Sequence, residues 1–295
     1  MNRDDYQTGV ILVVVAAIFW SCMGLAIRMV PDAGTWAIMF WRSFGTVLVL
    51  GCFVGWRSGW NLFSAIKGVG LAGVIGGLGL VAAYGGAIYA IQATTIANAV
   101  FLFAASPFLT ALLGWLLLRE PVRRATWAAI AVAGIGMLIM VREGLSTGAL
   151  AGNLAALGSA LGFAAFTVTL RWGRLADMLP AVILGGLFAM AVAAIVIWIN
   201  GQPLMLPPRD LAITLAMGVI LLGCGMTLYT MGSRAVPAAE LALLAMVEVM
   251  LAPLWVWLLL GETASATTFI GGSIVLLAVV LNALTGIRRR SARIA

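Results

Sequence analysis

The chain has 295 residues, of which 63% are hydrophobic and 9% are charged, and its formal net charge is +7. Soluble domains carry about 25% charged residues, so a mean hydropathy of +1.13 excludes a water-soluble enzyme, a disordered scaffold and a nucleic-acid-binding domain. A membrane-spanning helix needs about 20 apolar residues, and the sequence therefore predicts an integral membrane protein with short loops.

Ten apolar runs follow one another along the chain, and we predict that each forms a transmembrane helix. Lipid offers the backbone no hydrogen-bonding partners, and no run alternates like a barrel strand. The first run is too long for the core of a signal peptide, about 7–15 residues, so we expect it to be retained. The predicted fold class is all-α integral membrane, with spans at about 8–29, 35–55, 68–91, 95–118, 125–141, 148–171, 179–200, 211–232, 238–260 and 266–286.

The distribution of Arg and Lys predicts the orientation, because these residues favour cytoplasmic loops. With the N-terminus inside, three cations fall in outer loops, thirteen fall in inner loops and tails, and Arg42 lies within a span. Both termini are therefore expected in the cytoplasm, and the expected location is a bacterial-type inner (plasma) membrane. The outer cations are Arg28, Arg142 and Arg209; the inner ones are Arg3, Arg57, Lys67, Arg119, Arg123, Arg124, Arg171, Arg174, Arg234, Arg288, Arg289, Arg290 and Arg293.

An internal repeat is visible when the sequence is shifted by 142 or 143 positions, which aligns Glu120 with Glu262 and Arg28 with Arg171. Chance similarity between leucine-rich helices is the alternative to duplication. We predict a five-helix repeat over 1–145, a second over 146–287 and a basic cytoplasmic tail over 288–295. Five spans are an odd number, so the second repeat is expected to be inverted around a central cavity, an arrangement frequent in carriers.

Four short motifs carry a family resemblance that covers nearly the whole chain. They are Phe19-Trp20-Ser21, Phe40-Trp41-Arg42, the stretch from Leu116 to Pro121, and the Gly-rich stretch from Ala133 to Gly136. In their order and spacing they resemble EamA-type ten-span members of the drug/metabolite transporter superfamily, in particular its exporters of aromatic amino acids. The resemblance implies a basket of ten helices whose cavity is lined mainly by spans one, three, four, six, eight and nine.

Two ionisable residues lie deep within predicted spans, where a charge costs about 2.5–3.5 kcal/mol on insertion scales. Glu248 lies in the middle of span nine, and Arg42 lies in span two at a similar depth. Glu248 could recognise an amine or exchange a proton in a cavity. The structural alternative is an intramembrane ion pair between Arg42 and Glu248.

Polar residues recur at a spacing of eight, which places them on nearly the same side of a helix. Glu240 and Glu248 have this spacing in span nine, and Asn98 and Ser106 have it at the repeat-equivalent positions of span four. We expect these residues to face one place and to line the cavity. Ordinary polar contacts between helices are the alternative.

Aromatic residues within the spans suggest the apolar part of a binding site. We expect Trp20, Tyr84, Phe101, Phe163 and Tyr229 to border the cavity and to suit an aromatic or large aliphatic solute by stacking and burial of area. Core packing is the alternative for each of them.

The predicted function is that of a secondary transporter exporting small organic solutes, namely aromatic or large neutral amino acids and related metabolites. We predict no enzymatic activity, catalytic residue, metal or cofactor, because the chain has no histidine and no nucleotide-binding fingerprint. The predicted partners are the solute and the lipid bilayer, not nucleic acid; the oligomeric state stays open, and a monomer is compatible. The alternatives are a multidrug or lipophilic-cation exporter using Glu248 and, more distantly, a membrane receptor or scaffold.

Overall fold

The computed structural model describes residues 3–175, 177–236 and 238–294, and within them the chain is helical with no strand. The elements are α1 (Arg3–Ser21), α2 (Met23–Arg28), α3 (Thr35–Arg57), α4 (Leu62–Lys67), α5 (Gly70–Ala93), α6 (Ile96–Phe103), α7 (Ser106–Leu118), α8 (Arg124–Thr147), α9 (Leu150–Trp172), α10 (Leu179–Ile199), α11 (Pro208–Ala216), the π-helix η1 (Met217–Cys224), α12 (Gly225–Gly232), α13 (Ala238–Leu260) and α14 (Ala266–Ile294).

The predicted spans coincide with these elements to within about three residues at most ends, but α1 begins at Arg3 instead of 8, and α8 ends at Thr147 instead of 141. Nine helical stretches among the described residues are long and apolar enough to cross a membrane, and the apolar part of α13 at Met246–Leu260 is shorter. The sequence did not predict α4, a short helix in the connection between spans two and three. Helix α14 continues to Ile294, while the side chains of the predicted basic tail lie outside the described residues.

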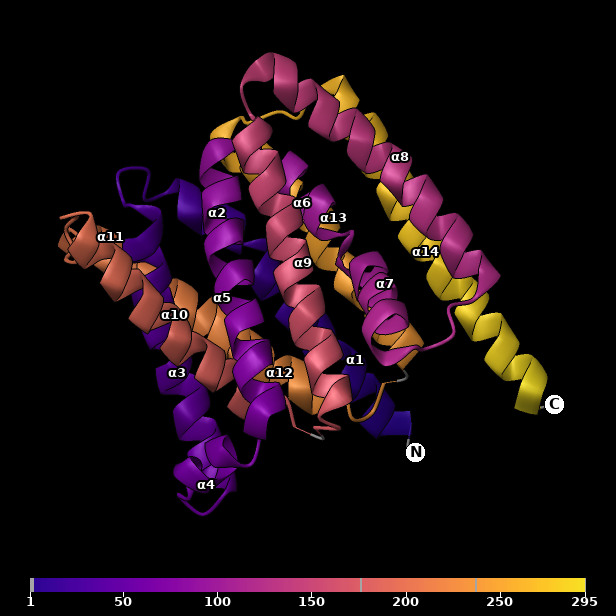
Figure 1. Cartoon of the computed structure of the whole chain (residues 1–295), viewed down its shortest axis with the longest axis horizontal. Coiled ribbons are helices and arrows are strands. Elements are labelled where there is room, and N and C mark those ends of the chain that lie inside the picture. Colours follow the sequence, from indigo (N-terminus) through magenta and orange to yellow (C-terminus); the bar gives the residue numbers. More distant parts are fainter. Residues whose placement is uncertain (1–2, 176, 237, 295) are drawn as a thin grey trace.

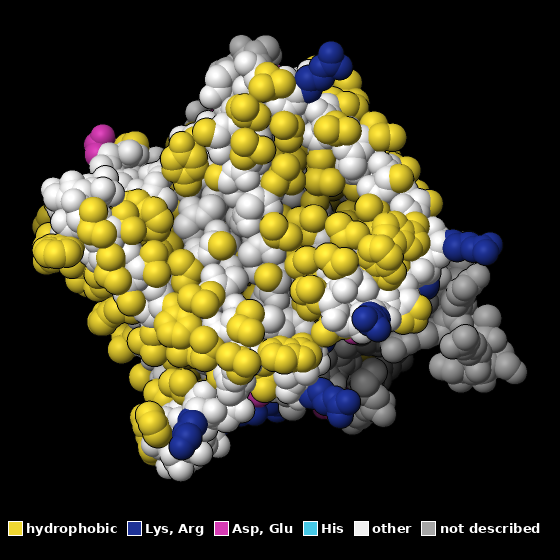
Figure 2. Space-filling model, in the orientation of Figure 1, with side chains coloured by type: hydrophobic (Ala, Val, Ile, Leu, Met, Phe, Trp, Pro, Cys, Tyr) yellow, Lys and Arg dark blue, Asp and Glu magenta, His cyan; other side chains and the backbone are white. Residues whose placement is uncertain are grey.

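Both chain ends lie at the same end of the helix bundle, which we call the proximal end; the opposite end is the distal end (Figure 1). The α7–α8 connection lies at the proximal end, and the α8–α9 connection lies at the distal end. Helices α8 and α14 run side by side along one edge of the bundle (Figure 1). Hydrophobic side chains cover much of the face shown in Figure 2, and its Lys and Arg side chains lie toward the rim. An apolar exterior of this kind suits lipid.

Small residues allow the central helices to approach closely. Helix α5 packs along α9 at Gly79 and Gly162. A Cβ atom on Gly79 would lie 2.8 Å from the Gly162 carbonyl oxygen, and one on Gly162 would lie 2.6 Å from the Gly79 carbonyl oxygen. Backbone contact of this kind is how transmembrane helices associate without a hydrophobic driving force. It joins span three to span six at the centre of the bundle.

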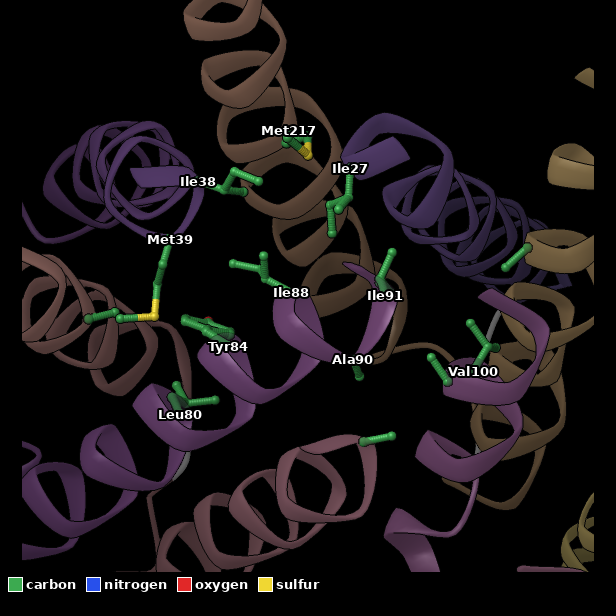
Figure 3. Packing of buried hydrophobic residues seen from close by; sticks show 14 of the residues in the cluster. Ile27, Ile38, Met39, Leu80, Tyr84, Ile88, Ala90, Ile91, Val100 and Met217 are labelled. Atoms are coloured by element: carbon green, nitrogen blue, oxygen red, sulfur yellow. The ribbon is translucent and has the colours of Figure 1, made fainter. Parts of the chain in front are cut away.

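The buried core lies where α2, α3, α5 and η1 meet. Figure 3 shows Met39 and Tyr84 pointing toward each other, with Ile38 and Ile88 beside them. These residues are between 0% and 9% exposed. The core therefore includes Tyr84, a predicted cavity residue, and it surrounds Arg42, the arginine within span two.

Candidate functional site

Three of the spans are not continuous α-helices. Span one breaks at Cys22 between α1 and α2, and span four breaks at 104–105 between α6 and α7, just before Pro107. Proline lacks the amide hydrogen that a helix interior needs, which favours this break. Span eight contains the π-helix η1, and π-helical turns are frequent at functional sites. The irregular backbone lies inside the bundle, where protein can satisfy it.

Two of the predicted aromatic residues form a pair beside this irregular region. The rings of Trp20 and Tyr229 have centroids 5.3 Å apart and planes inclined at 42°. The indole of Trp20 packs directly on Gly225, one turn before Tyr229. A Cβ atom on Gly225 would lie 2.5 Å from Trp20 Nε1. That Nε1 donor is buried and has no hydrogen-bond acceptor among the described residues. The pair thus joins spans one and eight through an apolar surface with one free donor, and we call it the aromatic pair.

The structure places Arg42 against Tyr84 rather than against Glu248. The guanidinium carbon of Arg42 lies 4.7 Å from the centroid of the Tyr84 ring. Arg42 is 3% exposed and Tyr84 is 9% exposed. No ion pair among the described residues includes Arg42 or Glu248, so the predicted intramembrane pair is not formed in this structure. Glu248 is half-buried.

Helices α1 and α13 run parallel and in register. Two hydrogen bonds join residues that are 234 positions apart: Tyr6 Oη donates to Glu240 at 2.6 Å, and Trp255 Nε1 donates to Ser21 Oγ at 2.8 Å. Glu248 lies seven residues before Trp255, and seven residues are about two helical turns. Glu248 therefore shares the face of α13 that is turned to α1, in a largely apolar seam.

Asn98 of span four and Glu240 of span nine have separate partners. The amide of Asn98 donates to Asn153 on α9 and, at 3.0 Å, to Thr94. Glu240 contacts Tyr6 near the proximal end, and Ser106 lies beyond the α6–α7 break. Asn98 lies in the first turn of span four, beside the distal Ile96–Glu262 contact, and Glu240 lies in the first turn of span nine, so these two residues are at opposite depths. That Ser106 and Glu248, near the middle of their spans, line the cavity stays a prediction.

The structure also gives the surroundings of Phe101 and Phe163, two further predicted cavity residues. Phe101 is 6% exposed and packs against Gly272 of α14, where a Cβ atom would lie 2.1 Å from the Phe101 ring. Phe163 is 43% exposed and contacts Phe166, with ring centroids 6.0 Å apart. Phe101 therefore packs against α14, and Phe163 lies on an exposed face of α9; that they border the cavity stays a prediction.

Two ion pairs link distant parts of the chain at opposite ends of the bundle. At the distal end, Arg28 Nε lies 3.0 Å from a Glu262 carboxylate oxygen. At the proximal end, Arg171 pairs with Glu120. The shift that aligns Arg28 with Arg171 also aligns Glu262 with Glu120 to within one residue. Each pair therefore joins one half of the chain to the other, and the two pairs occupy equivalent positions.

The distal ion pair belongs to a wider polar network. Glu262 accepts a hydrogen bond from the backbone N–H of Ile96 at 2.8 Å, and Arg28 donates to the Thr94 carbonyl at 2.8 Å. The network borders a pocket of about 520 Å³ that is also lined by Asn98, Glu143 and Thr268. A second pocket of about 300 Å³, near the proximal end, is lined by Arg57 and Asp177, which form an ion pair at 3.1 Å.

Sequence reasoning did not propose the four residues of the repeat-related ion pairs as a site. The internal repeat aligned Arg28 with Arg171 and Glu120 with Glu262. This alignment was the sequence signal that could have identified the four residues as a site. Within the described part of the chain, no three His, Cys, Asp or Glu side chains cluster in a way that could hold a metal ion.

The fold, the apolar exterior and the interrupted helices define a multi-pass membrane protein. The profile of the EamA-like transporter family matches residues 7–142 and again residues 150–284. The chain therefore belongs to the EamA-like transporter family, as the sequence motifs indicated.

Two curated proteins are similar over nearly their whole length. An uncharacterised transporter of Bacillus subtilis strain 168, YwfM, is 24% identical over 92% of each chain. The pseudopaline exporter CntI of Pseudomonas aeruginosa is 27% identical over 95% of this chain and 97% of its own. A protein of known crystal structure shares the fold, with a TM-score of 0.62 and 18% identity over 95% of this chain and 98% of that chain.

Proposed function

We propose that this protein is a secondary transporter that exports small organic solutes, with aromatic or large neutral amino acids and related metabolites as its substrates. The observation that carries the proposal is the pair of repeat-related ion pairs, Arg28–Glu262 and Arg171–Glu120, at opposite ends of the bundle. In the proposed mechanism the two repeats are inverted, and each pair holds the repeats together at one membrane face.

Alternating access follows from this arrangement. Separating the repeats at the distal end breaks Arg28–Glu262 and leaves Arg171–Glu120 in place, while separation at the proximal end does the reverse. Each open state breaks one ion pair and keeps the other, so that solute binding can shift the balance between the two states. A receptor or scaffold would have no need for such a duplicated contact.

The aromatic pair and Glu248 supply the chemistry for the solute. Trp20 and Tyr229 offer stacking surface to an aromatic or large aliphatic side chain. The Glu248 carboxylate, which has no ion pair among the described residues, could receive an ammonium group. The two curated relatives are named as transporters, one of them an exporter, which supports the proposed direction of transport.

A lipophilic-cation exporter is the second candidate. Its support is the same unpaired Glu248 together with Trp20, because an indole attracts organic cations through its ring face. Both candidates place the protein in a bacterial-type inner membrane with its proximal end, and so both termini, in the cytoplasm. The excess of Arg and Lys in the predicted inner loops supports that orientation.

Transport assays in proteoliposomes test the proposal. The purified protein is reconstituted, and counterflow of radiolabelled phenylalanine, leucine and tetraphenylphosphonium is measured. We expect phenylalanine and leucine to move. Trp20→Ala and Tyr229→Ala should each lower their transport at least tenfold. Trp198→Ala is the matched control, because Trp198 is 83% exposed near the distal end of α10.

The outcome separates the candidates. Movement of tetraphenylphosphonium alone would favour the cation exporter. No movement of any of the three solutes by folded protein would contradict the transport proposal. If Trp20→Ala and Tyr229→Ala transport as well as the control Trp198→Ala, the aromatic pair is not part of the solute site.

A further inference from the structure

Arg42 is a buried cation whose hydrogen-bonding capacity the protein leaves unused. Its side chain is 3% exposed. Its Nε and Nη2 donors are buried and have no acceptor among the described residues. No ion pair in the described part of the chain includes Arg42. A buried charged donor without a partner is costly, so a role that uses these donors is needed to explain the residue.

The backbone of Arg42 is held firmly against the π-helix. Thr46 Oγ1 donates to the Arg42 carbonyl at 3.0 Å and lies 3.2 Å from the Gly218 carbonyl oxygen. A Cβ atom on Gly218 would lie 2.0 Å from the Arg42 carbonyl oxygen, so only glycine permits this contact. The side chain of Arg42 then reaches α5, where its guanidinium lies over the Tyr84 ring.

The contact with Tyr84 satisfies only part of the guanidinium. An aromatic face attracts the positive charge, but it is not a full acceptor for the N–H groups, and Nε and Nη2 keep no acceptor among the described residues. Tyr84 Oη is also buried and has no partner among the described residues. Two adjacent side chains, both buried within the bundle, therefore offer unused donors in one place.

We propose that Arg42 binds the carboxylate of the transported solute. A carboxylate fits because its two oxygens match the fork of N–H donors that guanidinium presents. A small solute is favoured over a lipid headgroup because Arg42 lies in the core at 3% exposure, about seven residues or 10 Å inside α3. The inference rests on the proposed function and deepens it, since it makes a carboxylate the shared feature of the substrates.

The site has a consequence for specificity. An amino acid would present its carboxylate to Arg42 and its side chain to an apolar surface. A lipophilic cation has no group that Arg42 could hold, and its binding would be independent of this residue. Arg42 therefore discriminates between the two candidate functions.

The test uses three probes of similar shape with the full-length protein in phosphatidylcholine nanodiscs. L-Phenylalanine carries both charged groups, 3-phenylpropionate carries only the carboxylate, and phenethylamine carries only the amine. Binding is measured by the shift in thermal unfolding and by titration calorimetry. The variants are Arg42→Met and Arg42→Lys, with Arg209→Met as a control because Arg209 is exposed. Phenylalanine counterflow of the wild type is measured in parallel.

We expect Arg42→Met to weaken binding of phenylalanine and 3-phenylpropionate at least tenfold and to leave any binding of phenethylamine unchanged. Arg42→Lys should lose part of the affinity, since it keeps the cation but not the fork, and it decides the case if Arg42→Met does not fold. Arg209→Met should bind like the wild type.

Equal affinity of wild type and both Arg42 variants for the two carboxylates would overturn the inference, while wild-type phenylalanine counterflow would leave the transport proposal standing. Failure of the wild type to bind or move any probe would contradict the transport proposal itself. A lipid arm uses nanodiscs with added phosphatidylglycerol. If phosphatidylglycerol raises the stability of the wild type but not of the Arg42 variants, while the free carboxylates have no effect, a lipid headgroup binds Arg42. That result would also overturn the inference.

Discussion

The distal ion pair should be energetically stronger than its repeat-related counterpart. Glu262 accepts from Arg28 at 3.0 Å and 3.3 Å and from the Ile96 backbone at 2.8 Å. The distal side chains are 26% and 23% exposed, whereas those of Arg171 and Glu120 are 42% and 45% exposed. Water therefore screens the proximal pair more strongly.

The expected magnitudes follow from this difference. Charge-assisted hydrogen bonds contribute about 1.5–3 kcal/mol when well buried, and partial exposure reduces the distal coupling to about 1–2 kcal/mol. The proximal pair should contribute about 0–1 kcal/mol, as exposed pairs do. Since 1.4 kcal/mol is a factor of ten, loss of the distal pair should shift the balance toward distal opening by about 5- to 30-fold.

A double-mutant cycle measures the coupling directly. Arg28→Met, Glu262→Gln and the double variant are compared by reversible unfolding in mixed detergent micelles. Glu262→Gln keeps the shape and an acceptor for the Ile96 N–H while removing the charge. The matched control is the same cycle on Arg171 and Glu120.

The reasoning would be refuted by a distal coupling below about 0.3 kcal/mol, which is the usual limit of additivity. A proximal coupling larger than the distal one would refute the argument from exposure in particular. Counterflow by the same variants then tests whether the pairs act in transport or only in folding.

Three further predictions concern single positions. In a background without native cysteines, a cysteine at Thr263 should react with an impermeant thiol reagent from outside and one at Ser58 should not; the reverse pattern would reject the proposed orientation. Glu248→Gln should not lower stability, because an unpaired carboxylate in an apolar seam is itself costly to bury, and it should lower amino acid counterflow at least tenfold. Normal counterflow would remove Glu248 from the site. Phe101→Ala should lower the free energy of unfolding by about 3–5 kcal/mol. Gly272→Ala should lower it by about 1–3 kcal/mol, because its Cβ atom would lie 2.1 Å from the Phe101 ring. Both are measured by thermal unfolding, and full stability of the variants would contradict the packing role.

Much of the fold could be predicted because its signals are local. Each span is an apolar run of sufficient length, and charges and turn-forming residues mark the connections, so most predicted limits agree with the helices to within about three residues. The helix breaks were harder to foresee. Cys22 and η1 lie in uniformly apolar sequence, where composition does not distinguish an α-helix from an interrupted one.

The site was predicted only in part. Trp20 and Tyr229 were both selected because they are aromatic residues within spans, and the structure brings their rings together. Phe101 was selected for the same reason, yet it packs against Gly272. The pattern gives the residue type and the approximate depth, but the direction of a side chain depends on which helix packs beside it.

The sequence by itself determined that this protein is a multi-pass membrane protein and to which family it belongs. These properties depend on the composition of short segments and on motifs read in order. Only the tertiary structure decided that Arg42 faces Tyr84 instead of Glu248 and that two arginines meet two glutamates from the other half of the chain. Arg171 and Glu120 are 51 positions apart and Arg28 and Glu262 are 234 apart, so these contacts depend on the packing of whole helices, which no local segment encodes.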